Sequence, residues 1–203
     1  MLTIIDYKAG NQTSVQRALN YLGIENQISS DPKVILNSDH IIFPGVGHAS
    51  ASMEVLKERG LDFAITDAFQ QGIPILGICI GSQIILTHSE EGDTPCLDLI
   101  SGDVKRFQFP TYGLKIPHMG WNEINLRKTH PVLDGLTSGS EFYFVHSYYT
   151  APVDPQQVFA TCTYGITFPV AIGVKNLFAV QFHTEKSGRT GLKLLENFSR
   201  WIP

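Results

Sequence analysis

The stretch PILGICIGSQ, residues 74–83, decides the fold of this chain. Its apolar first half is typical of a short buried strand, and the pattern over 81–87 predicts that a helix follows directly. Cys79 lies at the junction, between Gly77 and Gly81. Glycines at these positions suit a sharp strand-to-helix turn, because larger side chains two positions from the central residue would collide.

Strands and helices are also predicted to alternate in the residues between the N-terminus and this stretch. A Gly10-Asn11 turn precedes a helical pattern that Gly23 should end, and Asp31-Pro32 predicts the cap and first residue of another helix. Short strands separated by helices build βαβ units and a parallel sheet. We predict strands at 2–5, 24–28, 40–43 and 74–78, and further helices at 50–59 and 62–71.

The second half of the chain predicts a different arrangement, in which strands follow one another closely with turns between them. A mixed or antiparallel extension of the sheet explains this pattern. The whole chain, 1–203, is expected to be one α/β domain with a mainly parallel central sheet flanked by helices. The predicted strands are 123–126, 142–146, 158–163, 170–174 and 177–181, and a final helix covers 188–202.

Composition excludes several classes of protein. With 43% hydrophobic and 17% charged residues, the chain is too apolar to be disordered. No run of eighteen apolar residues occurs, so no membrane span is expected, and the first residues lack the basic start of a secretory signal. A net charge of −4 argues against nucleic acid as the main partner. Three widely spaced cysteines fit a reducing cytoplasm rather than a disulfide framework.

Cys79 is the candidate nucleophile. The strand-to-helix turn would lift its side chain clear of the sheet, and the start of a helix favours a negatively charged sulfur. The backbone N–H of Ile80 could then stabilise a developing oxyanion. The competing interpretation is a small buried core cysteine, since free cysteine is among the most buried residue types.

A cysteine nucleophile needs a base, and His183 is the strongest candidate because it ends an apolar strand and Glu185 follows two positions later. In extended chain these two side chains would share a face, so the carboxylate could orient the imidazole. The local sequence equally allows a strand-end histidine beside a surface glutamate. Neither a Cys-x-x-Cys nor a His-Glu-x-x-His occurs, and the dinucleotide and P-loop glycine patterns are incomplete, so neither a metal nor a cofactor is predicted.

Several motifs together resemble a known family. The strings PGVG (44–47), GICIGSQ (77–83) and QFHTEKSG (181–188) resemble class I, triad-type glutamine amidotransferases. KIPHMGWN (115–122) and YFVHSY (143–148) are similar to one branch of that family, the glutaminase subunits of imidazole glycerol phosphate synthase. The resemblance covers essentially the whole chain and implies the fold of that family.

The resemblance also implies a reaction, the hydrolysis of L-glutamine through a γ-glutamyl thioester without a cofactor. Cys79 would attack the side-chain amide, His183 would transfer protons, and Glu185 would orient His183. From local sequence alone, the implied substrate contacts would be read as an ordinary polar helix start and strand end. The implied oxyanion or gating residues are Val46, Gly47 and Ile80, and the implied substrate contacts are Gln83, Ser147 and Tyr148.

Residues 117–122 fall between predicted strands and carry a methionine and a tryptophan, residue types enriched at protein interfaces. Composition alone leaves core packing and partner contact equally open. The resemblance favours contact with a (β/α)8-barrel cyclase that receives ammonia through an internal passage. The implied interface residues are Gly10, Asn11, Pro117, His118, Met119, Gly120, Trp121 and Asn122.

Ile80, Ser82 and Thr184 stand where the family more often has leucine, methionine and proline. This drift leaves open a paralogous glutaminase subunit that feeds ammonia to a surface-sugar amidotransferase. Two further alternatives are a stand-alone cysteine hydrolase of the same fold, which would need no partner, and a regulatory subunit with an inactive site.

Overall fold

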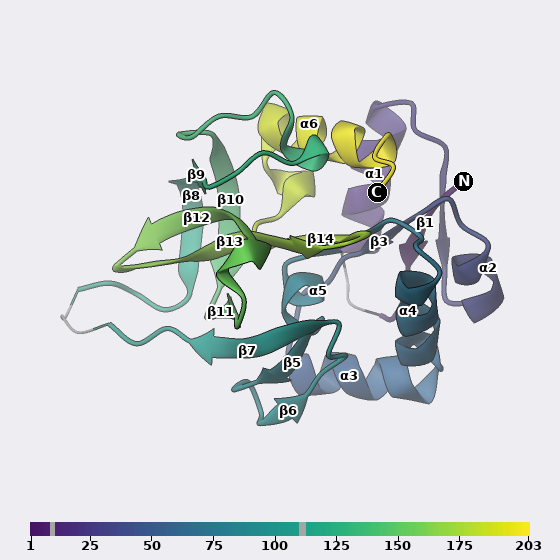
Figure 1. Ribbon diagram of the computed structural model, residues 1–203, viewed down its shortest axis with the longest axis horizontal. Coiled ribbons are helices and arrows are strands. Elements are labelled where there is room, and N and C mark those ends of the chain that lie inside the picture. Colours follow the sequence, from purple (N-terminus) through teal and green to yellow (C-terminus); the bar gives the residue numbers. More distant parts are fainter. Residues whose placement is uncertain (9–10, 110–112) are drawn as a thin grey trace.

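A central eight-stranded sheet organises the chain, whose computed structural model describes residues 1–8, 11–109 and 113–203. The strand order is β2-β1-β3-β4-β14-β13-β12-β9, and Figure 1 shows this sheet between layers of helices. The strands of the sheet are β1 (Leu2–Ile5), β2 (Asn26–Ser29), β3 (His40–Phe43), β4 (Ile75–Ile78), β9 (Asn125–Leu126), β12 (Val158–Tyr164), β13 (Ile166–Val174) and β14 (Leu177–Val180).

The first five strands in this order pair in parallel, as the βαβ pattern predicts. Helices α1 and α6 cover one face of the sheet, and α2, α3 and α4 pack against the other (Figure 1). Alternate strand residues serve the two cores, with Ile4 on the side of α1 and Ile5 on the side of α3. The helices are α1 (Gln12–Tyr21), α2 (Pro32–Leu36), α3 (Ala49–Glu58), α4 (Leu61–Gln70), α5 (Ile80–Gln83) and α6 (Gly188–Ser199).

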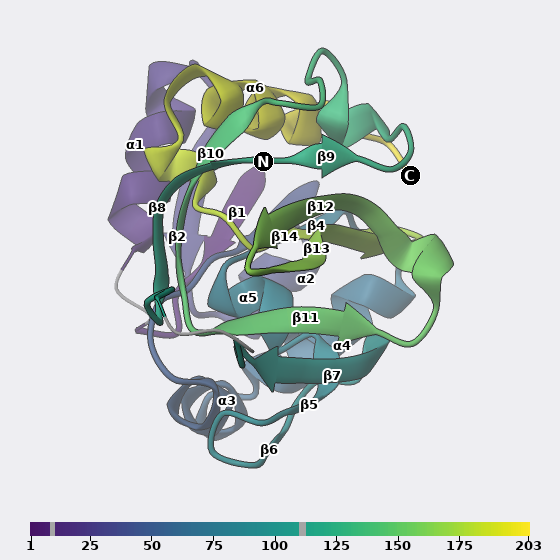
Figure 2. The ribbon, with the colours of Figure 1, turned by 90° about the vertical axis from the view of Figure 1, so that its left-hand side faces the viewer.

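The antiparallel extension is confirmed, because β13 pairs antiparallel with β14 and β12, and β12 with β9. Two smaller sheets accompany it. One pairs β8 (His118–Glu123) with β10 (Glu141–His146), and the other has the order β11-β7-β5-β6 (Figure 2). The strands of that second small sheet are β5 (Leu86–Ser89), β6 (Thr94–Pro95), β7 (Ile100–Arg106) and β11 (Tyr148–Pro152). None of the helices in the described part of the chain combines the length and the hydrophobicity that a membrane span requires.

The helix predicted over 81–87 is wrong beyond its first turn. Helix α5 ends at Gln83, because the following carbonyl groups leave the helical pattern and accept hydrogen bonds from residues 97–99. Leu97 N–H donates to Ile84 O at 2.9 Å, and Leu99 N–H donates to Ile85 O at 2.9 Å. Tertiary pairing thus overrides a short helical pattern and starts β5 instead.

The placement of 117–122 between strands is also wrong. All but the first of these residues belong to β8, where burial alternates along the strand. His118 points inward, whereas Met119 and Trp121 are 62% and 55% exposed, so neither of these two packs into the core. The predicted strand 123–126 is correspondingly divided between β8 and β9.

Candidate active site

Cys79 lies at the sharp turn between β4 and α5, with φ 53° and ψ −109°. This backbone conformation is rare for a residue with a side chain. Both neighbouring glycines are required by close approach. A Cβ on Gly77 would lie 2.8 Å from Gly81 O, and a Cβ on Gly81 would lie 2.0 Å from Phe43 O. The expected crowding at the turn is therefore confirmed, with β3 as the second obstacle.

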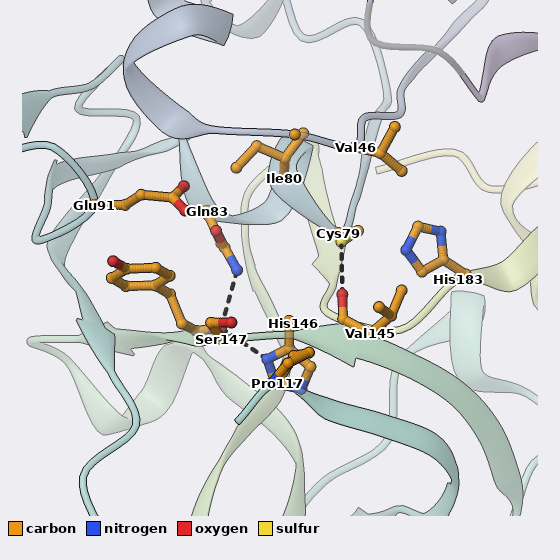
Figure 3. Close-up of a pocket in the computed structure, with 12 residues that line it drawn as sticks. Val46, Cys79, Ile80, Gln83, Glu91, Pro117, Val145, His146, Ser147 and His183 are labelled. Carbon is orange, nitrogen blue, oxygen red and sulfur yellow. Dashed lines mark hydrogen bonds between the residues drawn. The ribbon is translucent and has the colours of Figure 1, made fainter. Parts of the chain in front are cut away.

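His183 follows the last strand of the sheet, β14, which pairs directly with β4. Its N–H donates to Tyr143 O at 2.9 Å, and its carbonyl accepts from the hydroxyl of Ser187 at 2.5 Å. These bonds fix the backbone of His183 across from Cys79. Figure 3 shows the imidazole of His183 facing Cys79 across the site.

Glu185 holds the other side of the imidazole. His183 Nδ1 and Glu185 Oε1 are 2.7 Å apart, and both side chains are fully buried. Asn11 Nδ2 donates to the same carboxylate oxygen at 3.1 Å. The contact between His183 and Glu185 was predicted from the sequence, but the extended backbone predicted for these residues is not found. Glu185 lies in a 3₁₀ turn, Thr184–Lys186, that folds the carboxylate back onto the ring.

The electrostatics of this pair favour a charged imidazole. Burial lowers the pKa of His183, but interaction with Cys79 and the hydrogen bond and charge attraction to Glu185 outweigh it and raise the pKa to about 10. For Glu185, burial raises the pKa, whereas the bonds from His183 and Asn11 lower it, and the net direction is down. An imidazolium beside the sulfur provides the counter-charge that a thiolate nucleophile needs.

A cavity of about 350 Å³ opens in front of Cys79, a size suited to a small metabolite. It brings together every residue that the sequence assigned to the oxyanion or to substrate. Gln83 Nε2 donates to Tyr148 O at 3.0 Å, so α5 and the start of β11 form one wall (Figure 3). The lining comprises Val46, Gly47, Cys79, Ile80, Gln83, Glu91, Pro117, Val145, His146, Ser147, Tyr148 and His183.

The loop 44–47 borders the cavity and is held firmly at one end. The buried hydroxyl of Tyr7 donates to Pro44 O at 2.7 Å, and burial, more than any other cause, raises the pKa of Tyr7. A Cβ on Gly45 would lie 1.9 Å from that hydroxyl. Gly47, by contrast, has φ 120°, and a Cβ there would meet nothing within 4 Å. Close packing therefore holds the loop at Gly45, whereas the space beside Gly47 is open.

Sequence reasoning missed two polar residues of the cavity. Among the described residues that line it, Glu91 is the only acidic one, and its Oε2 accepts from Ala49 N–H at 2.8 Å. His146 enters from the end of β10. Glu91 lies in a segment without a recognisable motif, and His146 was one histidine among seven, so neither had a local signal.

The predicted interface residues are not equivalent. Gly10 lies outside the described residues. Asn11 and His118 are buried, with side chains bonded to Glu185 and His146 respectively, so their side chains point away from a partner surface. Met119 and Trp121 are the exposed apolar members of the set.

Comparison with known proteins is consistent with this geometry. Residues 3–201 match the family model described as "Glutamine amidotransferase class-I". The chain therefore belongs to the class I glutamine amidotransferase family, as its motifs suggested.

The particular relatives are more specific. The chain is 50% identical over 207 residues to the imidazole glycerol phosphate synthase subunit HisH of Nitratidesulfovibrio vulgaris (strain DP4), covering 99% of this chain and 96% of the relative. It is 46% identical over 199 residues to the HisH subunit of Dehalococcoides mccartyi (strain ATCC BAA-2266 / KCTC 15142 / 195), covering 98% and 96%.

Solved structures share the fold at much lower identity. The crystal structure of a glutamine amidotransferase superposes with a TM-score of 0.74 at 19% identity, over 97% of this chain and 98% of that one. PurLQS from Thermotoga maritima gives 0.75 at 17%, over 100% and 98%. The fold class expected from the sequence is thereby confirmed.

Proposed function

We propose that this chain is the glutaminase subunit of an imidazole glycerol phosphate synthase, hydrolysing L-glutamine and passing the ammonia to a cyclase subunit for histidine biosynthesis. The observation that carries the proposal is the nucleophile Cys79 at a strained turn, opposite an imidazole that Glu185 holds at 2.7 Å. The HisH relatives favour this branch over a surface-sugar paralogue.

The chemistry follows from the positions of three side chains. The sulfur of Cys79 attacks the amide carbon of glutamine, and the oxyanion that forms lies against the backbone N–H of Ile80 and the 46–47 peptide. His183 gives its proton to the departing ammonia, leaving a thioester. It then takes a proton from water, whose oxygen attacks the thioester carbon and releases glutamate and the thiolate. These steps use protein groups and water alone.

The cavity supplies groups that match the amino-acid end of glutamine. The carboxylate of Glu91 is the natural partner of the substrate's α-ammonium group. The backbone of Ser147 and Tyr148, on the wall opposite, would contact the remaining polar atoms, and Gln83 supports that wall through Tyr148 O. We place the reaction in the cytoplasm, where a free thiol stays reduced.

The nucleophile test uses the complex of this chain with its synthase partner. Cys79→Ala should abolish glutamine hydrolysis while the complex still forms product from added ammonium. Cys96→Ala is the matched control, because Cys96 lies away from the cavity lining and should keep both activities. Glutamine hydrolysis that persists in Cys79→Ala would overturn the assignment. Turnover by the isolated chain equal to that of the complex would favour a stand-alone hydrolase.

We also propose that Met119 and Trp121 form the contact with a (β/α)8-barrel partner, because β8 presents both to solvent beside the cavity residue Pro117. Trp121→Ala should raise the Kd for the partner by about 30-fold, the effect of losing an aromatic hot spot. Phe63→Ala is the control, since Phe63 is also exposed but lies on α4, across the sheet from β8. Equal effects of the two variants on the Kd would refute the proposal that Met119 and Trp121 contact the partner. The protein that co-purifies with this chain would identify the synthase.

A further inference from the structure

Two buried histidines outside the triad contact each other beside the cavity. His118 and His146 are directly opposite in the antiparallel pair β8–β10, and His118 Nδ1 lies 2.9 Å from His146 Nε2. Both rings are inside an aromatic cluster, where His118 stacks on Phe144 and Tyr164 with centroids 4.8 and 4.2 Å away. In a hydrogen bond between two imidazole rings, one nitrogen must donate and the other must accept. The groups bonded to the remaining ring nitrogens determine which ring is the donor.

The direction of every hydrogen bond follows from the far end of the pair. His146 Nδ1 is 2.7 Å from Tyr148 O, and because a carbonyl only accepts, this nitrogen carries a proton. Neutral His146 then accepts at Nε2, so His118 donates from Nδ1. His118 in turn accepts at Nε2 from Asn122 Nδ2, at 3.2 Å. The orientation of the Asn122 amide is fixed independently, because Nδ2 also donates to Thr163 O and Oδ1 accepts from Glu123 N–H.

Both rings remain neutral, which keeps this order intact. Burial lowers the pKa of His118 to about 4 and that of His146 to about 3. A carboxylate is within hydrogen-bond distance of neither ring among the described residues, in contrast to His183. The pair is therefore a fixed series of donors and acceptors at neutral pH and does not act as a base.

The series ends on an atom of the substrate cavity. Tyr148 O accepts from His146 Nδ1 and from Gln83 Nε2, so two side chains from different elements hold this one carbonyl. Both Ser147, which connects β10 to β11, and Tyr148, the first residue of β11, line the cavity here. This carbonyl is part of the Tyr148 backbone, so holding it fixes the backbone conformation of Tyr148 next to Ser147 at the cavity wall.

We propose that the series Asn122–His118–His146 is a positioning relay that orients the Ser147–Tyr148 backbone for binding the amino-acid end of the substrate. The proposal rests on the proposed function, since it names the part of that same site that the relay serves. None of the three residues touches the reacting atoms. The relay should therefore act on glutamine binding and leave the chemical step nearly unchanged.

The kinetic test compares two substitutions at one position in the complex with its synthase partner. His118→Phe keeps an aromatic ring between Phe144 and Tyr164 but removes both hydrogen bonds, and it should raise the KM for glutamine about tenfold with kcat within about twofold. In His118→Asn, the amide nitrogen takes the place of Nδ1 and can still donate to His146, so KM should recover to within about threefold of the native value. Tyr164→Phe is the control, because it loses only the bond from its hydroxyl to Lys115 O and should leave KM unchanged.

Three kinetic outcomes would overturn the relay: an unchanged KM in His118→Phe, no recovery in His118→Asn, or a fall in kcat with KM unaltered. A second measurement uses the native chain alone, so it requires no glutamine and does not depend on whether a variant folds. Nitrogen-15 NMR of the native chain at pH 7 should show both rings protonated at Nδ1 and unprotonated at Nε2. A proton on Nε2 of either ring would refute the series. If NMR showed the predicted protonation of both rings in a chain that hydrolyses no glutamine, the proposed function would be refuted, and with it the role of the relay in substrate binding.

Discussion

Replacing Gly81 by alanine tests how strictly the turn at the nucleophile depends on close packing. The new Cβ would lie 2.0 Å from Phe43 O, whereas ordinary contact begins at 3.4 Å. Helix α5 and strand β3 must therefore separate by about 1.4 Å, the difference of these two distances. The obstacle is a backbone carbonyl at the end of β3, so no flexible side chain can relieve the contact.

We expect this displacement to reduce both stability and activity. Overpacking of this kind costs about 3 kcal/mol in the free energy of unfolding. The peptide that joins Cys79 to Ile80 would move with the helix, and an error of about 1 Å in a catalytic group can lower the rate by about 100-fold. Urea unfolding measures the first effect, and glutaminase assays of the complex measure the second.

Gly60→Ala is the matched control for this substitution. Gly60 has φ 66° at the start of α4, and a Cβ there would meet nothing within 4 Å. The cost is then backbone strain alone, about 1 kcal/mol, with activity retained. If Gly81→Ala proved as stable and as active as Gly60→Ala, the packing argument for the turn would be wrong.

Three further predictions concern the triad and the thiols. Asn11→Ala removes one hydrogen bond to the triad carboxylate and should lower kcat for glutamine about tenfold, measured in the complex; an unaltered kcat would show that Asn11 does not position the carboxylate. The folded pKa of His183 is about 10, above its unfolded value of 6.5, so the contribution of His183 to stability is complete below pH 6.5 and is lost as the pH rises through about 10. The free energies of unfolding of the native chain and of a His183→Gln variant, measured with urea, should therefore converge at high pH. A difference that stays constant with pH would contradict the raised pKa. Burial raises the pKa of Cys96 to about 11 and of Cys162 to about 12, so brief iodoacetamide treatment at pH 7.5 followed by mass spectrometry should modify Cys79 first, and earlier modification of either other thiol would be the contrary result.

The sequence correctly predicted the elements in which the local residue pattern favours the same secondary structure that packing in the folded protein requires. Strand 2–5 and the capped helix at Asp31-Pro32 are confirmed, because burial on both faces and a capping side chain leave a local signal. The helix over 81–87 failed for the opposite reason. Its apolar residues suit either a helix or a buried strand, and partners at 97–99 decided between them.

The candidate site divides in the same way. Cys79 was identifiable because its backbone geometry requires glycines at fixed spacing. The part played by Asn11 was not, since its contact with Glu185 joins residues 174 positions apart. Likewise, the bond between His118 and His146 depends on the register of β8 with β10, which the local sequence does not specify.

The position of β14 has a consequence for how this protein is made. Among the described strands β14 comes last in the sequence, yet in the sheet it lies between β4 and β13, and His183 and Glu185 follow it directly. During translation, a nascent chain that has emerged only as far as β13 lacks a strand at the centre of its sheet and holds a nucleophile without a base. The proposed hydrolysis can therefore begin only after β14 has been inserted into the sheet.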